Sequence, residues 1–125
     1  MKSILIVEDE WNLRLLYSQE FKAEGFEVVA VPDGRSAREQ VRQRAFDLAI
    51  VDVKLEGESG LDVLRELMSE NRRLRVILNS AYSSFMSDFT SWSADAYLVK
   101  SSDLSELKSK VRELTSPATS MMAMA

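Results

Sequence analysis

The chain has 125 residues, of which 46% are hydrophobic and 29% charged, with a formal net charge of −4 and a pI near 4.9. This size and composition are typical of one globular domain with a single core, and they argue against a largely disordered chain. Because its Lys and Arg residues are scattered, the chain lacks the basic face that direct nucleic-acid binding requires, so no nucleic-acid partner is expected.

The sequence contains neither cysteine nor histidine. Without cysteine there are no disulfides, thiolate nucleophiles or thiolate metal ligands. Without histidine, the usual general base and the commonest zinc ligand are missing. Any chemistry must therefore use carboxylates, hydroxyls, amines and backbone groups.

Neither a signal peptide nor a membrane-spanning segment is expected. The N-terminal apolar run ends within a few residues in three acids, and no stretch approaches the roughly 20 apolar residues of a transmembrane helix. The sequence therefore predicts a cytoplasmic protein with no membrane partner.

Short apolar runs recur at wide spacing along the chain. They are rich in β-branched residues and continuous rather than alternating, which is typical of strands buried on both faces of a parallel sheet. The five runs cover residues 4–7, 28–31, 48–51, 76–78 and 96–99.

The segments between these runs have the apolar spacing of amphipathic helices. Gly25 is predicted to cap the first helix at its C-terminus, and Asp33 and Asp103 are predicted N-caps of later helices. The apolar stripes are Leu13, Leu16, Tyr17 and Phe21; Leu61, Leu64, Leu67 and Met68; Phe85, Phe89 and Trp92; and Leu104, Leu107, Val111 and Leu114.

Alternating strands and helices predict right-handed βαβ crossovers and an α/β fold. Five strands fit the flavodoxin-like order 2-1-3-4-5, a (βα)5 three-layer sandwich whose site lies at the carboxyl ends of the parallel strands. Residues 117–125 have neither charge nor periodicity. We therefore expect a domain over residues 1–116 and a disordered tail, or the start of a linker, over 117–125.

Acidic residues follow two strands that this order makes neighbours. Glu8 and Asp9 come after the first strand, and Asp52 comes directly after the third. A single acid at a strand end is usually a solvated loop residue, but three at this point of the fold are expected to converge. Crowded carboxylates shift toward the neutral form unless a cation binds them, and a few hard oxygen ligands suit Mg²⁺.

Two more strand ends contribute polar groups. Ser80 follows the fourth apolar run and Lys100 the fifth. Alone, the serine reads as a turn residue and the lysine as solvated surface. Together with the acids, they form a cation site, a carboxylate nucleophile, a hydroxyl and a positive charge, which are the parts needed to bind and hold a phosphoryl group.

These strand-end motifs resemble the CheY-like receiver domains of two-component response regulators, and the resemblance covers residues 2–115. The matching segments are Ile-Val-Glu-Asp-Glu at 6–10, Val-Asp-Val-Lys-Leu-Glu-Gly-Glu-Ser-Gly-Leu at 51–61, Asn-Ser-Ala at 79–81 and Ala-Tyr-Leu-Val-Lys at 96–100.

The resemblance implies a role for each acidic residue. Asp52 is implied as the phosphoacceptor. Asp9 is implied as a direct Mg²⁺ ligand, and Glu8 as a ligand that acts directly or through water. The backbone carbonyl of Lys54 is implied as a further metal ligand.

The same resemblance assigns the remaining groups. Ser80 is implied to hydrogen-bond a phosphoryl oxygen, and Lys100 to pair with it. Tyr97 matches the aromatic residue that turns inward on activation, although a tyrosine in a strand is more often part of the core. Gly60 matches the glycine that ends the loop after the acceptor.

The implied function is a phosphorylation-dependent signalling switch with no enzymatic activity beyond its own phosphorylation and autodephosphorylation. A sensor histidine kinase or phosphotransfer protein would supply the phosphoryl group. A downstream effector protein or domain would read a surface formed by the helix expected within 81–93, the strand at 96–99 and the helix at 104–114. Homodimerisation through this surface is left open.

Two positions depart from the family pattern. The family usually has a cis proline after the lysine, whereas this chain has Ser101. A cis bond to a non-proline residue costs ~2.5–4 kcal/mol, so a trans Lys100–Ser101 bond is predicted. Glu56 replaces the usual proline in the loop after Asp52, which predicts greater mobility there.

The stripe of Phe85, Phe89 and Trp92 predicts the buried face of a helix, with an exposed aromatic docking surface as the alternative.

Three other functions compete with the switch. A haloacid-dehalogenase-type phosphotransferase needs a second acid at the position of Lys54. A nucleotide binder needs a phosphate loop where the chain has acids after its first strand. A pseudo-receiver that binds proteins without phosphorylation is favoured by the missing prolines and disfavoured by the presence of Asp52, Ser80 and Lys100.

Overall fold

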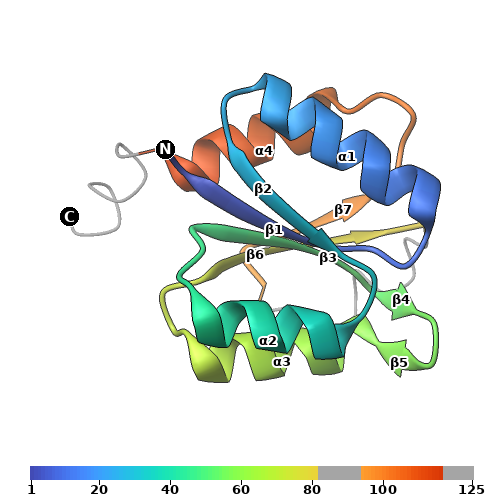
Figure 1. Ribbon diagram of the computed structural model, residues 1–125. Coiled ribbons are helices and arrows are strands. Elements are labelled where there is room, and N and C mark those ends of the chain that lie inside the picture. Colours follow the sequence, from blue (N-terminus) through green and yellow to red (C-terminus); the bar gives the residue numbers. More distant parts are fainter. Residues whose placement is uncertain (82–93, 117–125) are drawn as a thin grey trace.

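The computed structural model describes residues 1–81 and 94–116, and these residues form a five-stranded sheet whose neighbouring strands all run parallel. Its order is β2-β1-β3-β6-β7, which is the predicted order 2-1-3-4-5 (Figure 1). The strands are β1 (Ser3–Val7), β2 (Glu27–Val31), β3 (Leu48–Asp52), β6 (Arg75–Ser80) and β7 (Ala96–Val99).

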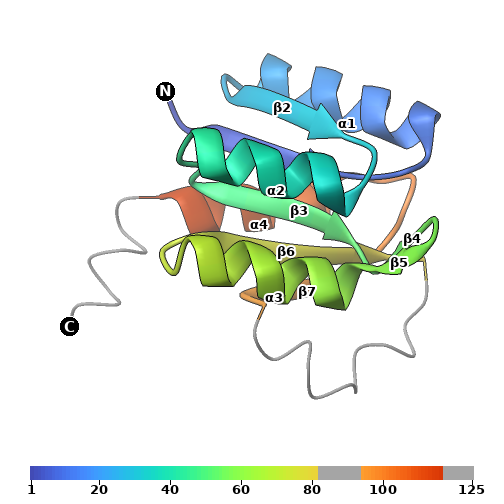
Figure 2. The same ribbon diagram turned by 60° about the horizontal axis from the view of Figure 1, so that its bottom comes forward.

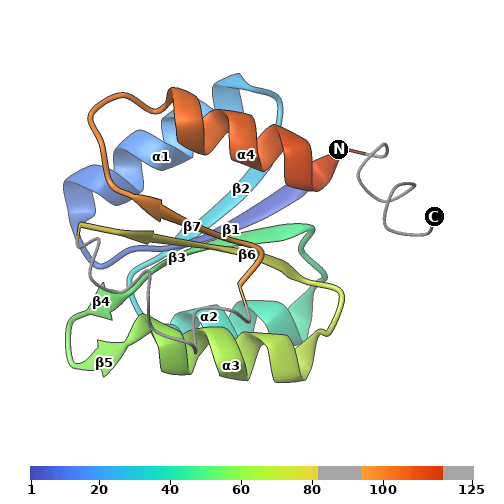
Figure 3. The ribbon, with the colours of Figure 1, turned by 180° about the vertical axis from the view of Figure 1, so that it is seen from behind.

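Helices cover both faces of this sheet, which confirms the three-layer α/β prediction. Helices α1 (Trp11–Ala23) and α4 (Ser105–Thr115) lie on one face (Figure 3). Helices α2 (Gly34–Gln43) and α3 (Gly60–Glu70) lie side by side on the other (Figure 2). None of the helices in the described part of the chain has the length and apolar character needed to span a membrane.

Two sequence predictions fall outside the described residues. They are the helix carrying Phe85, Phe89 and Trp92, and the tail at 117–125. Both stay predictions.

The core explains why the strand sequences are continuously apolar. All five residues of β1 are buried. Leu5 and Val7 belong to the cluster packed under α2 and α3, whereas Ile4 and Ile6 belong to the cluster under α1 and α4. Because successive side chains of a strand point to opposite faces, a strand covered on both faces needs apolar residues at every position.

Helix α1 ends in a Schellman motif built on Gly25, as predicted. Gly25 has a φ of +97°, its N–H donates to the carbonyl of Lys22, and the N–H of Phe26 donates to the carbonyl of Phe21. The rings of Phe21 and Phe26 meet edge to face at 6.1 Å, which is the apolar contact that accompanies this motif. The prediction that Leu16 belongs to the buried apolar stripe of α1 was wrong, since this residue is 40% exposed.

The two predicted N-caps had different outcomes. Asp33 caps α2 and accepts the N–H of Ser36 at 2.8 Å, as predicted. Helix α4 begins one residue later than expected, so its N-cap is Leu104. Asp103 still accepts the N–H of Ser105 at 2.9 Å, from one position before the cap.

The loop after β3 contains a small hairpin that the sequence pattern did not predict. Strands β4 (Lys54–Leu55) and β5 (Glu58–Ser59) pair antiparallel around Gly57, whose φ is +78°. Strands of two residues are too short to show periodicity, and only the glycine marks the turn. The greater mobility predicted for this loop stays a prediction.

Replacing Gly25 should test the helix-terminating motif. We expect Gly25→Ala to lower the free energy of unfolding by about 1–2 kcal/mol, because a Cβ is strained at positive φ. Gly25→Asn should cost less, since asparagine adopts this conformation more readily and nothing lies within 4 Å of the added Cβ. Urea denaturation measures both variants, and equal losses would contradict the role given to φ.

Candidate functional site

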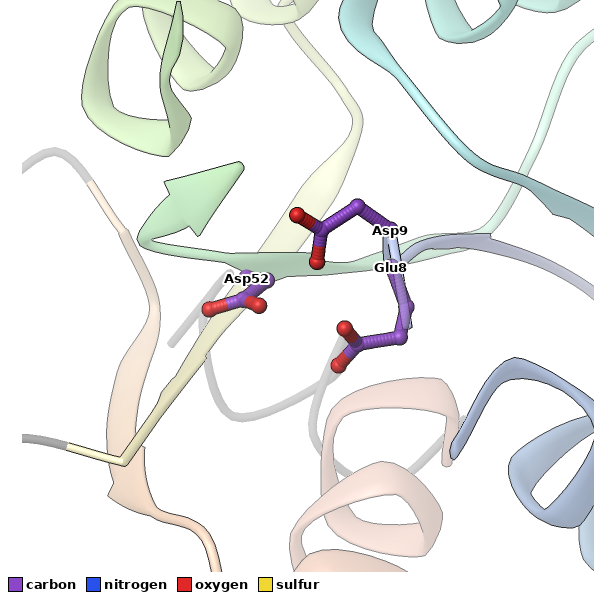
Figure 4. A group of neighbouring side chains, drawn as sticks. All are labelled: Glu8, Asp9 and Asp52. Atoms are coloured by element: carbon purple, nitrogen blue, oxygen red, sulfur yellow. The ribbon is translucent and has the colours of Figure 1, made fainter. Parts of the chain in front are cut away.

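Neighbouring strands deliver three acids to one place. Val7 at the end of β1 pairs in register with Val51 of β3, and the next residues are Glu8 and Asp52. Glu8 is 2% and Asp52 is 6% exposed. One carboxylate oxygen from each of Glu8, Asp9 and Asp52 lies within 4.8 Å of the others, and the three groups turn toward a common space (Figure 4). The predicted convergence of the acids is therefore confirmed.

Lys100, which directly follows the edge strand β7, bridges two of these acids. The Nζ of Lys100 lies 2.7 Å from Oε1 of Glu8 and 3.0 Å from Oδ2 of Asp52. Burial by itself would lower the pKa of Lys100, but the hydrogen bonds to Glu8 and Asp52 outweigh it and raise that pKa. The lysine is therefore an ammonium that neutralises much of the buried negative charge.

The backbone places this lysine. Its N–H donates to the carbonyl of Ser80 at 2.6 Å, which ties the end of β7 to the end of β6. The described residues contain no cis peptide bond, so the predicted trans Lys100–Ser101 bond is confirmed.

Glu8 is the acid whose protonation the site changes most clearly. Burial raises its pKa from the ordinary 4.5 to about 7, and the charge of Asp52 acts in the same direction. Hydrogen bonds from Lys100 and from the N–H of Glu10 oppose the rise without cancelling it. Glu8 thus changes charge near neutral pH.

The hairpin after β3 points backbone N–H groups at the acids. The N–H of Lys54 donates to Oδ1 of Asp52 at 3.2 Å, and the N–H of Glu56 donates to Oδ2 of Asp9 at 2.8 Å. These bonds fix the orientation of two carboxylates and leave their other oxygens to further partners. The structure therefore relates Lys54 to Asp52 through its N–H, and the metal-ligand role of its carbonyl stays a prediction.

Gly60 allows the chain to fold back against Asp52. Its N–H donates to the carbonyl of Val53 at 2.6 Å. A Cβ at this position would lie 1.9 Å from the carbonyl oxygen of Asp52, which is far inside van der Waals contact. Glycine is thus required by close approach, since its φ is not positive.

Sequence reasoning missed the contribution of Arg14. Its guanidinium donates to the carbonyl of Glu8 at 2.9 Å and to that of Asp9 at 3.3 Å, and so holds the backbone that carries both acids. The only signal in the sequence was a basic residue one turn into the helix that follows the acids.

The two remaining predicted residues lie in β6 and β7. Ser80 is fully buried at the end of β6, one strand away from Asp52. Tyr97 is half-buried in β7 and packs against the core under α2 and α3. Acids, ammonium and hydroxyl are thus gathered at the carboxyl edge of the sheet, where they can bind a cation and an oxyanion together.

The chain is similar to known signalling proteins over most of its length. A family model described as the response regulator receiver domain matches residues 4–112. The two-component response regulator PhoP of Pseudomonas aeruginosa is 34% identical over 113 residues, which are 89% of this chain and 50% of PhoP. Sporulation initiation phosphotransferase F of Bacillus subtilis is 26% identical over 114 residues, 90% of this chain and 92% of that protein. The chain thus spans about half the length of PhoP and nearly all of the second relative.

Solved structures of response regulators are also similar to this chain. The response regulator TrrA of Thermotoga maritima is 41% identical, with a TM-score of 0.87 over 91% of this chain and 99% of TrrA. A CheY-like receiver domain from Methanospirillum hungatei is 27% identical, with a TM-score of 0.85 over 90% of this chain and 92% of that one.

The pKa of Glu8 predicts a pH dependence of stability. Because the folded state binds an extra proton between pH 4.5 and about 7, the stability that this group contributes is complete below 4.5 and is lost as pH rises through about 7. With a chelator present, the difference in unfolding free energy between the wild type and Glu8→Gln should fall as the pH rises from 4.5 through about 7. A constant difference would contradict the raised pKa.

Gly60→Ala should test the close approach to Asp52. We expect a loss of at least about 2 kcal/mol in the free energy of unfolding, because the backbone beside Asp52 must move. Arg65→Ala, on the exposed surface of α3, should stay within about 0.5 kcal/mol. Urea denaturation compares the two, and equal stabilities would show that Gly60 is dispensable.

Proposed function

This chain belongs to the response regulator receiver domain family, and we propose that it is a phosphorylation-dependent signalling switch in which Asp52 accepts the phosphoryl group. One observation carries the proposal. The buried carboxylate of Asp52 lies 3.0 Å from the ammonium of Lys100 and within 4.8 Å of oxygens of Glu8 and Asp9. A nucleophile, a positive charge and a cation-binding group are thus present together.

Magnesium is the proposed cofactor. The three carboxylates are hard oxygen donors clustered closely enough to share one ion. The solved structure of TrrA is a complex with Mg²⁺ and BeF. We assign Asp9 and Asp52 as direct ligands, Glu8 as a direct or water-mediated one, and the carbonyl of Lys54 as a further one. The ion supplies positive charge that neutralises the phosphoryl oxygens.

The proposed transfer is an in-line displacement. An oxygen of Asp52 forms a bond to phosphorus while the bond between phosphorus and the donor breaks, and the electron pair leaves with the donor. The ammonium of Lys100 pairs with a phosphoryl oxygen, and the hydroxyl of Ser80 donates a hydrogen bond to another. Tyr97 is the proposed aromatic residue that responds to the new charge.

The proposed donor is a sensor histidine kinase or a phosphotransfer protein. TrrA, at 41% identity, has been solved in complex with the histidine kinase ThkA. In the present chain the transfer would be from a phosphohistidine nitrogen to Asp52, in the cytoplasm. The chain is a signalling domain, and we propose no enzymatic activity beyond its own phosphorylation and autodephosphorylation.

The proposed recipient of the signal is a downstream effector protein or domain. Such an arrangement fits a chain that spans about half of PhoP. Four further points stay predictions. They are the domain limits of 1–116, the tail at 117–125, homodimerisation, and the absence of direct nucleic-acid contacts.

Intact-mass measurement tests the switch. The full chain incubated with Mg²⁺ and acetyl phosphate should gain one phosphoryl group, and Asp52→Asn or a chelator should abolish the gain. Lys100→Gln should slow phosphorylation by at least about tenfold, because the phosphoryl oxygens lose their ammonium partner. Lys108→Gln, which breaks a surface ion pair with Glu20, should leave the rate unchanged.

The competing function is a protein-interaction module that works without phosphorylation. No adduct with any small phosphodonor, in a protein shown to be folded, would establish that alternative and overturn the switch.

A further inference from the structure

A second site lies on the sheet face that carries α1 and α4. A cavity of about 190 Å³ is lined by residues of β7, of the chain leading to α4, of the first turn of α4, and by Tyr17 of α1 and Asn79 of β6. Figure 3 shows β7, α4 and α1 on this side of the molecule. Among the described residues, its lining includes neither the three acids of the phosphoacceptor site nor Lys100. The cavity is therefore lined by different side chains from those of the site described above.

The inner end of this cavity is polar and buried. Tyr17 is 2% and Asn79 is 4% exposed, and Nδ2 of Asn79 donates to the hydroxyl of Tyr17 at 3.1 Å. Within residues 1–81 and 94–116, neither side chain makes another hydrogen bond. The hydroxyl proton of Tyr17 and the amide oxygen of Asn79 are thus a donor and an acceptor for an occupant of the cavity.

The remaining lining gives the cavity apolar walls and an acidic mouth. Leu98 and Leu107, both nearly buried, form part of the walls. Asp103 and Glu106 contribute carboxylates, and no Lys or Arg lines the cavity in the described part of the chain. Hydrogen bonds from the hydroxyl and N–H of Ser105 hold the pKa of Asp103 below its usual range, so this carboxylate stays charged.

We propose that this cavity binds a small organic amine whose other end carries a hydroxyl. The ammonium would lie near the carboxylates at the mouth, the hydrocarbon body against the leucines, and the hydroxyl between Tyr17 and Asn79. The volume equals about six waters at roughly 30 Å³ each, which limits the ligand to fragment size. The carboxylates of Asp103 and Glu106 would disfavour an anion in the cavity.

The cavity also adjoins the strands that carry the phosphoryl-site residues. Asn79 directly precedes Ser80, and Ser101, which lines the cavity, directly follows Lys100. An occupant would therefore contact both strand ends. The binding proposal itself does not depend on phosphorylation, and its test is run without Mg²⁺ or phosphodonor.

Three matched probes test the ligand chemistry on the wild-type full chain. Tyramine has the ammonium and the hydroxyl, phenethylamine lacks the hydroxyl, and para-hydroxyphenylacetate carries a carboxylate in place of the ammonium. We expect tyramine to bind with a dissociation constant on the order of millimolar. Phenethylamine should bind about fivefold more weakly, and para-hydroxyphenylacetate should not bind. Amide shifts in NMR titrations should map tyramine to β7, the start of α4 and Tyr17.

Variants locate the contacts. Tyr17→Phe and Asn79→Leu, each shown to be folded by circular dichroism, should weaken tyramine binding about fivefold. Glu106→Gln should also weaken it, whereas Glu39→Gln, the same charge change on α2 across the sheet, should not.

Other outcomes would overturn the proposal. A cavity that holds only water would give no tyramine shifts. Equal affinity for all three probes would show nonspecific adsorption. Unchanged binding in Tyr17→Phe and Asn79→Leu would place the ligand elsewhere.

Discussion

The ammonium of Lys100 lies between two buried carboxylates, 2.7 Å from Glu8 and 3.0 Å from Asp52, and the site depends on this arrangement. The pairing of β1 with β3 forces the two acids together at one edge of the sheet. Burial removes the hydration of Glu8, and the charge of Asp52 adds a smaller repulsion, which is why the pKa of Glu8 rises to about 7. Lys100, which follows the edge strand β7, offsets this cost by placing a positive charge between the two carboxylates.

Backbone groups hold the rest of the site. The N–H groups of the β4–β5 hairpin bind two of the carboxylates, and Arg14 binds the carbonyls of the loop that follows β1. Gly60 lets the chain return to the carbonyl of Asp52 at a distance that no other residue allows. Each of these restraints has a main-chain group as donor or acceptor, so the remaining carboxylate oxygens are oriented before any partner binds. Such preorganisation is what stabilising a charged transition state requires.

The sequence by itself determined the fold class, the strand order and the residues at the strand ends. It did so because a strand buried on both faces must be apolar at every position, a pattern that residues 4–7 and 48–51 show without ambiguity. Parallel strands end at one edge, so the acids after them had to converge there. The glycine at the end of α1 was equally readable, since its role is set by the local backbone.

Only the tertiary structure decided the features that depend on contacts between distant segments. The hairpin strands of two residues carry no periodic signal, and the exposure of Leu16 depends on how α1 lies on the sheet. The bridge from Lys100 to Glu8 and Asp52 joins residues far apart in the chain, and so does the hydrogen bond between Tyr17 and Asn79. Local spacing determines which residues reach an edge or a face of the sheet. Packing then determines which of them meet, and therefore which charges are buried and which hydrogen-bonding groups are left for a ligand.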